Sequence, residues 1–407
     1  DRARRAIESV KERVTKSGKK LAVYLDIAEP WSYLTAQAVQ RLIDTYAIEL
    51  EVHIVTPPAS DVDPFPILRT KHGVRDALQL AEYWDIDFTG KKEADPGGIR
   101  DASTVLVRER PARDQLRAFL ALAKAVWAND RKEIAKLQGT WGHEAHGSVL
   151  PILNANYGEL RKAGHYQASM MSFGGEWFWG IDRLPYLEDA IAKELGVPVA
   201  HVVKPRTDRD KLPMPAVKAC EFWYSFRSPY SYIALEQIEA VLAPYNIPLD
   251  LRAVFPMVNR GVQLPNAKRM YVVRDAKREA DRLHLPFGNV CDPIGTGVDH
   301  CIALAYWQKD NQLPLVKSIM RGIWSEARDM AEYIDLRYVV ERAGLDWNEA
   351  KNHLANPEAA KWANANATDM AVFSLWGVPS FRLGEFVAWG QDRLPLLADR
   401  LRRNALS

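Results

Sequence analysis

The fold is decided by residues 224–232, which have the sequence YSFRSPYSY. This stretch has the pattern of a β-strand end, a tight turn and the start of a helix. Pro229 suits the first helical position, where its missing N–H costs nothing. Ser228 would then be the N-cap, beside the unpaired amides and the positive dipole end of the helix. Such a place can hold an anion, for which a thiolate is one candidate, whereas a serine that only caps its helix is the alternative.

The length of 407 residues favours two domains of about 200 residues each. The net charge of +2 implies no strong field, so nucleic acid is not an expected partner. The longest apolar runs are far shorter than a membrane span, so no membrane association is expected. Residues 1–20 are rich in arginine and lysine and lack an apolar core, which favours a helical extension over a secretory signal.

The chain has three cysteines, Cys220, Cys291 and Cys301, and none belongs to a Cys-x-x-Cys pair. This usage is typical of a reducing compartment, so a cytoplasmic location is expected. Cys220 lies in an apolar, strand-like stretch and is expected in the core, while Cys291 and Cys301 are expected to be free thiols. No His/Cys cluster has the spacing of metal ligands, so no metal site is predicted.

A repeat becomes visible when the sequence is shifted by 231 − 32 = 199 positions. The PWSY at 30–33 then falls on the PYSY at 229–232, and the VRDA at 74–77 falls on the VRDA at 273–276. The match needs no gap over roughly sixty residues, and its period of 199 residues is far longer than that of a solenoid repeat. The sequence therefore predicts a duplicated domain.

Each half is predicted to run strand, helix, strand, long helical region, two short strands and closing helix, which defines an α/β class. The predicted parts are a helical extension at 1–20, a first domain at 21–202, a polar linker at 203–215 and a second domain at 216–407. In the first half we expect strands at 21–27 and 49–55, a helix at 31–46, a helical insertion at 70–160, a strand region at 174–179 and a helix from residue 182. In the second half we expect an insertion at 268–369, strands at 380–383 and 386–389, and a helix at 392–402.

The third strand of the second half opens at residues 377–381, which have the sequence GVPSF. Proline is tolerated at the first residue of a strand. A cis bond between Val378 and Pro379 would turn the backbone groups of Val378 toward the helix that begins after Ser228. Those groups could then pair with an extended peptide in β-strand fashion. Most X–Pro bonds are trans, so the residues by themselves leave the isomer open.

The order of these motifs, from SPYS through a helical insertion to GVPSF and then WGQDRLP at 389–395, resembles the DsbA-like branch of the thioredoxin superfamily. Within that branch the chain is similar to the 2-hydroxychromene-2-carboxylate isomerase and kappa-class glutathione transferase family. The resemblance covers nearly all of 216–407 and extends more weakly over 20–200. It implies two tandem thioredoxin-like (DsbA-like) domains, each with a helical insertion. In the family a serine replaces the first redox cysteine and glutathione, the implied cofactor, supplies the thiol.

By this resemblance Ser228 matches the serine that stabilises the glutathione thiolate. Val378, before the expected cis Pro379, matches the backbone that pairs with the cysteinyl unit. A hydroxyl and a helix dipole at the sulfur, next to a backbone ladder, form a physically sensible set.

The two ends of glutathione have their own counterparts by the same resemblance. Gln391 and Asp392 match the dipeptide that receives the γ-glutamyl end, where a carboxylate can face the α-ammonium group. Asn259 and Lys268 have the nine-residue separation of the family residues near the glycyl end. The alternatives are that Asp392 only caps the last helix and that Asn259 and Lys268 are solvated surface residues.

Several positions depart from the family pattern. Ser225 stands where the family usually has aspartate, and Arg227 adds a positive charge before Ser228. In the first half Glu29 takes the position of Ser228, which places a carboxylate where a thiolate would lie, and like charges disfavour each other. The replacements at the other family positions are Ser60 for Asn259 and Arg69 for Lys268, and no Val-Pro precedes the third strand. The first half is therefore expected to lack a conventional glutathione site.

The function predicted from this resemblance is a glutathione-dependent isomerase or transferase that acts on a small electrophilic or aromatic-acid substrate. The alternative is a non-catalytic DsbA-like protein that binds a peptide or a thiol. A disulfide oxidoreductase is disfavoured because the chain has no Cys-x-x-Cys. The acceptor, the choice between isomerase and transferase, and any ligand of the first domain stay open. The assembly is either a monomer with pseudo-dimeric domains or a homodimer.

Overall fold

The computed structural model describes residues 20–206, 209–212, 217–260 and 264–405. Of the predicted helical extension at 1–20, all but Lys20 lies outside these residues. The chain divides into two units, Asp1–Asp208 and Arg209–Ser407, and the division falls inside the stretch predicted as the linker, 203–215. Each unit is described by itself below.

The first unit is built on a four-stranded sheet with the strand order β2-β1-β3-β4. β1 is parallel to β2, whereas β3 is antiparallel to both β1 and β4. The alternation of apolar residues in KLAVYL places Leu21, Val23 and Leu25 of β1 in the core. The elements are β1 (Lys20–Leu25), α2 (Pro30–Thr45), β2 (Glu49–Ile54), α3 (Pro66–Trp84), α4 (Pro96–Leu106), α5 (Ala112–Trp127), α6 (Arg131–Trp141), α7 (His146–Ala163), β3 (Met170–Phe173), β4 (Glu176–Trp179), η1 (Ile181–Arg183) and α8 (Leu184–Leu195).

The second unit repeats this arrangement in a sheet with the order β6-β5-β7-β8. β5 is parallel to β6 and antiparallel to β7, which is antiparallel to β8. Its elements are β5 (Cys220–Tyr224), α9 (Pro229–Leu242), η2 (Ala243–Tyr245), β6 (Leu249–Ala253), η3 (Met257–Arg260), α10 (Asn266–Arg282), α11 (Thr296–Trp307), α12 (Leu313–Ser325), α13 (Tyr333–Arg342), α14 (Trp347–Ala350), η4 (Lys351–His353), α15 (Pro357–Val372), β7 (Ser380–Leu383), β8 (Phe386–Trp389), η5 (Gln391–Arg393) and α16 (Leu394–Ala405).

The prediction of an α/β fold with two thioredoxin-like domains is confirmed, because both sheets have the same strand order and both carry a helical insertion. One difference concerns the end of the first unit. The two short strands predicted there are β3 and β4, but the region expected at 174–179 starts too late: the hairpin begins at residue 170, and Gly174 and Gly175 form its turn with φ of 55° and 84°. These positive φ values are the ones that glycine adopts at little cost.

A buried contact between the first and second helices of each unit has also been duplicated. Trp31 of α2 donates its indole N–H to the Asp76 carboxylate of α3, at 2.7 Å. At the matching positions of the second unit, the Tyr230 hydroxyl donates to the Asp275 carboxylate, also at 2.7 Å. Both carboxylates are 1% exposed, and these donors help to satisfy them, in the second unit together with Arg278 at 3.2 Å from Asp275.

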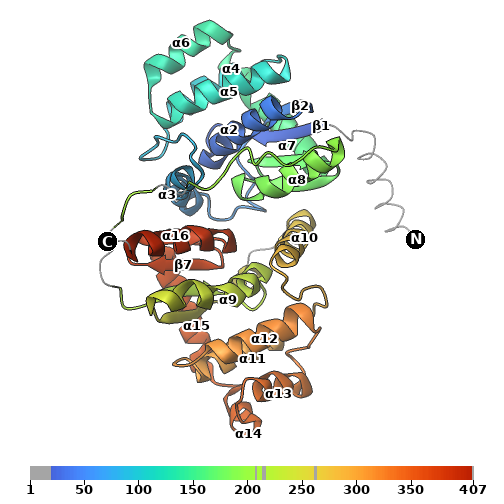
Figure 1. Cartoon of the computed structure of the whole chain (residues 1–407), viewed down its shortest axis with the longest axis vertical. Coiled ribbons are helices and arrows are strands. Elements are labelled where there is room, and N and C mark those ends of the chain that lie inside the picture. Colours follow the sequence, from blue (N-terminus) through green and yellow to red (C-terminus); the bar gives the residue numbers. More distant parts are fainter. Residues whose placement is uncertain (1–19, 207–208, 213–216, 261–263, 406–407) are drawn as a thin grey trace, which may run out of the picture. The chain divides into compact units, whose positions relative to one another are not determined.

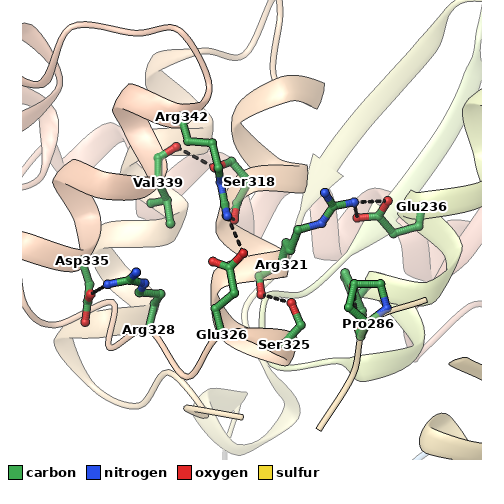
Figure 2. A network of polar contacts seen from close by, with 11 residues as sticks. Glu236, Pro286, Ser318, Arg321, Ser325, Glu326, Arg328, Asp335, Val339 and Arg342 are labelled. Atoms are coloured by element: carbon green, nitrogen blue, oxygen red, sulfur yellow. Dashed lines mark hydrogen bonds and ion pairs between the residues drawn. The ribbon is translucent and has the colours of Figure 1, made fainter. Parts of the chain in front are cut away.

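Within the second unit α9 packs against α10, α12 and α16, and α12 packs against α13, so that these helices follow one another across the unit (Figure 1). Ion pairs between arginines and carboxylates stabilise the insertion (Figure 2). The pairs are Arg321–Glu236 at 3.0 Å, Arg328–Asp335 at 2.9 Å and Arg342–Glu326 at 2.5 Å. The first of them joins α12 to α9, the helix that begins after Ser228. Among the described helices of the chain, none is long and apolar enough to cross a membrane.

Replacing Tyr230 by phenylalanine should destabilise the second unit by about 1–3 kcal/mol, because a buried carboxylate loses a donor. Urea unfolding measures the change as a lower midpoint with an unaltered slope. Tyr333→Phe is the control, since Tyr333 is 61% exposed, and should leave the midpoint in place. Equal midpoints for Tyr230→Phe and the wild type would show that the Asp275 contact does not stabilise the fold.

Candidate functional site

The turn between β5 and α9 places Ser228 at the N-cap of α9, with extended backbone angles and Pro229 at the first helical position. The Ser228 hydroxyl oxygen accepts a hydrogen bond from the Ser231 N–H at 3.2 Å. The same hydroxyl donates to the Val378 carbonyl oxygen at 3.3 Å, across 150 residues of sequence. The side chain thus caps the helix and also contacts the loop before β7, and it is only part-buried.

The loop before β7 contains a cis peptide bond between Val378 and Pro379. The carbonyl of Val378 faces Ser228, while its N–H has no acceptor in the part of the chain that the structure describes. The Pro379 carbonyl accepts from the Gly390 N–H at 2.9 Å, which holds the end of β8 against this loop. A Cβ on Gly377 would lie 2.7 Å from the indole nitrogen of Trp389, so glycine lets this ring pack closely on the loop.

The turn after β8 contributes Gln391, which is 4% exposed and donates its amide to the Glu279 carboxylate of α10 at 2.8 Å. Asp392 follows and pairs with the buried Arg393 at 3.1 Å. The turn that the Gly390–Pro379 hydrogen bond joins to the Val378–Pro379 loop therefore carries the Gln391 amide, with its partner Glu279, and the Asp392 carboxylate. Glu279 did not figure among the predicted site residues; α10 carries three acidic residues interspersed with basic ones, and nothing in that pattern singles Glu279 out.

Lys268 lies in the first turn of α10 and is half-buried. It is 279 − 268 = 11 residues from Glu279, which corresponds to about 16 Å along the helix axis. Lys268 therefore lies near the start of α10, whereas Gln391 contacts the same helix near its end, through Glu279. The backbone of Asn259 belongs to η3, and its side chain lies outside what the structure describes.

The structure brings Ser228, Val378 and Pro379 into direct contact, and the Pro379–Gly390 hydrogen bond adds the turn that bears Gln391 and Asp392. Arg227, whose role the sequence left open, forms a hydrogen-bonded ion pair with Asp292 of the insertion. The insertion also contacts the turn through Trp324, whose indole N–H donates to the Phe226 carbonyl at 3.2 Å.

All three cysteines are free and none lies in this turn. Cys220 is fully buried, as predicted for a core residue, and burial raises the pKa of its thiol to about 12. Burial also raises the pKa of Cys301 and, with help from nearby aspartates, that of Cys291. These thiols stay protonated near neutral pH, which is unfavourable for thiolate chemistry. Among the described residues no group of three or more His, Cys, Asp or Glu side chains is arranged to hold a metal ion.

The matching turn of the first unit holds a buried carboxylate in place of the Ser228 hydroxyl. Glu29 is the N-cap residue of α2 and is 3% exposed. One of its oxygens accepts from the hydroxyls of Ser32 at 2.8 Å and Ser169 at 2.6 Å. The other oxygen accepts from the guanidinium of Arg69, which also lies over the Trp31 ring. The Glu29 carboxylate is therefore surrounded by donors from α2, α3 and the loop before β3.

Asp26 is a second buried carboxylate of this turn, at the position that corresponds to Ser225. Its Oδ1 accepts from the Ala28 N–H at 2.9 Å. Burial, and secondly the nearby Glu29, raise the pKa of Asp26 from 3.8 to about 7. The two turns thus differ in chemistry: the first has Asp26 and Glu29 where the second has Ser225 and Ser228. The Ser225 hydroxyl is buried and has no hydrogen-bond partner within the described part of the chain.

Residues 219–402 match the model of the DSBA-like thioredoxin domain family. The second unit is a DsbA-like thioredoxin domain. Among solved structures, 2-hydroxychromene-2-carboxylate isomerase is 21% identical, with 46% of this chain and 96% of that chain covered and a TM-score of 0.40. The cytosolic disulfide reductase DsbM from Pseudomonas aeruginosa, solved with and without GSH, is similar over the same shares; the structure without GSH is 17% identical with a TM-score of 0.36. The comparison with curated proteins gave no match.

The turn of the first unit contains contacts that sequence reasoning did not find. Sequence reasoning aligned Arg69 with Lys268 and set residues 165–170 against the Val-Pro of the second half, but it predicted neither the pairing of Arg69 with Glu29 nor a role for Ser169. Ser169 occupies the place of Pro379, because the Gly180 N–H donates to its carbonyl at 2.8 Å as the Gly390 N–H does to Pro379. A shift of 210 instead of 199 positions would have aligned the two, since the second insertion is longer.

Asp26→Asn should weaken the pH dependence of unfolding of the first unit. The folded state keeps the Asp26 proton up to a pH of about 7, whereas the unfolded chain loses it near 3.8, so stability falls as pH rises through this window. Above pH 7 this shift in the pKa of Asp26 lowers the free energy of unfolding by about 4 kcal/mol. Denaturation at several pH values measures the slope, and Asp44→Asn, a change at an exposed carboxylate, is the control. An unchanged slope in Asp26→Asn would contradict a raised pKa.

Proposed function

We propose that the second unit binds glutathione at the N-terminus of α9 and acts as a glutathione-dependent isomerase or transferase. The substrate class is a small electrophile, such as an aromatic-derived acid with an electron-poor double bond. The observation that carries this proposal is the position of the Ser228 hydroxyl, between the Ser231 N–H and the Val378 carbonyl. At this position a hydroxyl and the helix dipole would both stabilise a thiolate.

The residues present suit glutathione along its length. The Val378 N–H, which has no acceptor among the described residues, is available to an extended peptide lying beside Ser228. Near Gln391 the carboxylates of Glu279 and Asp392 suit an α-ammonium group. Lys268, about 16 Å along α10 from Glu279, suits the glycyl carboxylate. When bound, glutathione would supply a thiol nucleophile that adds to the double bond and then leaves or remains attached.

The contribution of the chain is to hold the thiol and to favour its ionised form. With the sulfur in place, the Ser228 hydroxyl would donate to it instead of to the Val378 carbonyl, and no carboxylate of this turn would oppose the charge. Fixing the sulfur and the acceptor in one site lowers the entropic part of the barrier. The acceptor would approach from the insertion, which reaches the turn through Trp324 and Asp292.

The alternative functions require different residues or would give different activities. A disulfide oxidoreductase needs a reactive thiol pair, whereas the three thiols here are free and have raised pKa values. A binding protein without activity would use the same groove but would show no turnover of an electrophile with glutathione. Free thiols also suit a reducing compartment, and we propose a cytoplasmic location on that ground. A monomer with two related domains and a homodimer both remain compatible with the proposal.

Ser228→Ala should raise the pKa of the bound glutathione thiol by about one unit, because one hydrogen bond to the thiolate is lost. A titration followed by the ultraviolet absorbance of the thiolate measures this value. Ser228→Asp is the matched variant: aspartate caps a helix as well as serine does, but its charge repels a thiolate. It should fold normally and bind glutathione more than tenfold more weakly. The proposal fails if the wild type shows no binding at millimolar glutathione, or if Ser228→Asp binds an equally acidic thiol.

Lys268→Gln should weaken glutathione binding by roughly tenfold, since a charge-assisted contact with the glycyl carboxylate is lost. The same change should have little effect on the C-terminal amide of glutathione, which lacks that carboxylate. Calorimetric titration of both ligands gives the comparison. Lys277→Gln is the control, because Lys277 lies on the same helix and pairs with Asp281. Equal losses for glutathione and its amide would remove Lys268 from the glycyl site.

A further inference from the structure

We propose that the first unit contains a carboxylate-binding site that its own Glu29 occupies, so that the site is closed by an internal ligand. In the second unit the corresponding space is left to an external ligand. The second unit would then have a site for an external ligand, whereas the Glu29 side chain would occupy the corresponding site of the first unit. Neither statement depends on the identity of the second unit's ligand.

The donors around Glu29 come from three separate parts of the unit. Ser32 belongs to the first turn of α2, Arg69 to the first turn of α3 and Ser169 to the loop before β3. Ser32 and Ser169 are fully buried, and Ser32 also accepts from the Asp26 N–H at 3.1 Å, which fixes its hydroxyl. Two hydroxyls and a guanidinium donate to one carboxylate, which accepts no backbone N–H of α2, and these side chains form an anion site whose anion is part of the chain.

Different residues stand at the positions of Arg69 and Ser169 in the second unit. Arg69 corresponds to Lys268 and Ser169 to Pro379. In the first unit the cation of α3 is drawn to the N-terminus of α2, where it neutralises Glu29. The serine at the proline position supplies a hydroxyl, which proline cannot do. Both substitutions therefore serve the Glu29 carboxylate, and together they explain why a carboxylate can be buried at this turn.

The Glu29 carboxylate is buried, and the donors around it are already occupied. Glu29 is 3% exposed and Asp26 is 4% exposed, and Asp63 lies 3.9 Å from the Arg69 Nε. An external anion would have to displace a covalently attached carboxylate that already holds all of these donors. A shorter side chain at position 29 would leave the donors in place without their acceptor, and buried donors without an acceptor are unfavourable. Such a variant should accept a small free carboxylate in place of the Glu29 side chain.

Chemical rescue of Glu29→Ala tests this directly. The variant should unfold at a temperature roughly 10 °C lower than the wild type, because Arg69 loses its buried partner. Sodium formate at increasing concentration should raise the unfolding temperature more than sodium chloride at equal ionic strength, as expected for a ligand of the folded state. Hydrogen–deuterium exchange of α2 assigns the effect to the first unit. The wild type and the double variant Glu29→Ala/Arg69→Gln should show no formate-specific rise.

Equal effects of formate and chloride on Glu29→Ala would overturn the proposal. If this variant does not fold, Glu29→Gln preserves the shape of the side chain and removes only its charge. It should unfold at a lower temperature than the wild type, and an unchanged temperature would also overturn the proposal. A glutathione titration of the same variants reports separately on the second unit, so a failure there would not be mistaken for a failure of the anion site.

Discussion

The N-terminus of a helix that faces the loop before the third strand is the constraint on which both units depend. The first amides of such a helix have no partner within the helix and require one from outside. In the second unit the Ser228 hydroxyl supplies it and also reaches the Val378 carbonyl. In the first unit Glu29 occupies the same N-cap position, but its carboxylate accepts no amide of α2 and instead contacts Arg69 and Ser169.

The two units share a fold, but the residue at this position, Glu29 or Ser228, gives their turns different chemical properties. The part-buried Ser228 hydroxyl at the N-terminus of α9 is neutral, whereas the buried Glu29 carboxylate at the N-terminus of α2 is already paired with Arg69 and two serine hydroxyls. The cysteines do not compensate, since all three are free and their pKa values are raised by burial. If the second unit performs thiol chemistry, the thiol must come from a ligand. The helical insertion, through Trp324 and Asp292, then becomes the wall from which an acceptor would be presented.

Much of this architecture follows from the residues because it rests on local patterns. Short strand-like runs bounded by turns predicted β1, β2, β7 and β8 to within a few residues, and the shift of 199 positions predicted the duplication. The cis bond at Pro379 is a property of the folded loop and could be expected only from the family resemblance. The Glu29 cluster joins residues 40 and 140 positions apart, so no spacing rule could predict it. The pairing of Gln391 with Glu279 is equally remote in sequence, at 112 positions.

We propose that the turn of the second unit accepts an external anion and that the turn of the first unit does not. A crystal structure of the full chain soaked with glutathione tests it most directly. The account predicts one glutathione per chain, with its sulfur within hydrogen-bonding distance of the Ser228 hydroxyl and its backbone paired with the Val378 N–H. The Glu29–Arg69 pair should be undisturbed in the same crystal. Glutathione bound in the first unit, or an empty second turn at millimolar ligand, would contradict it.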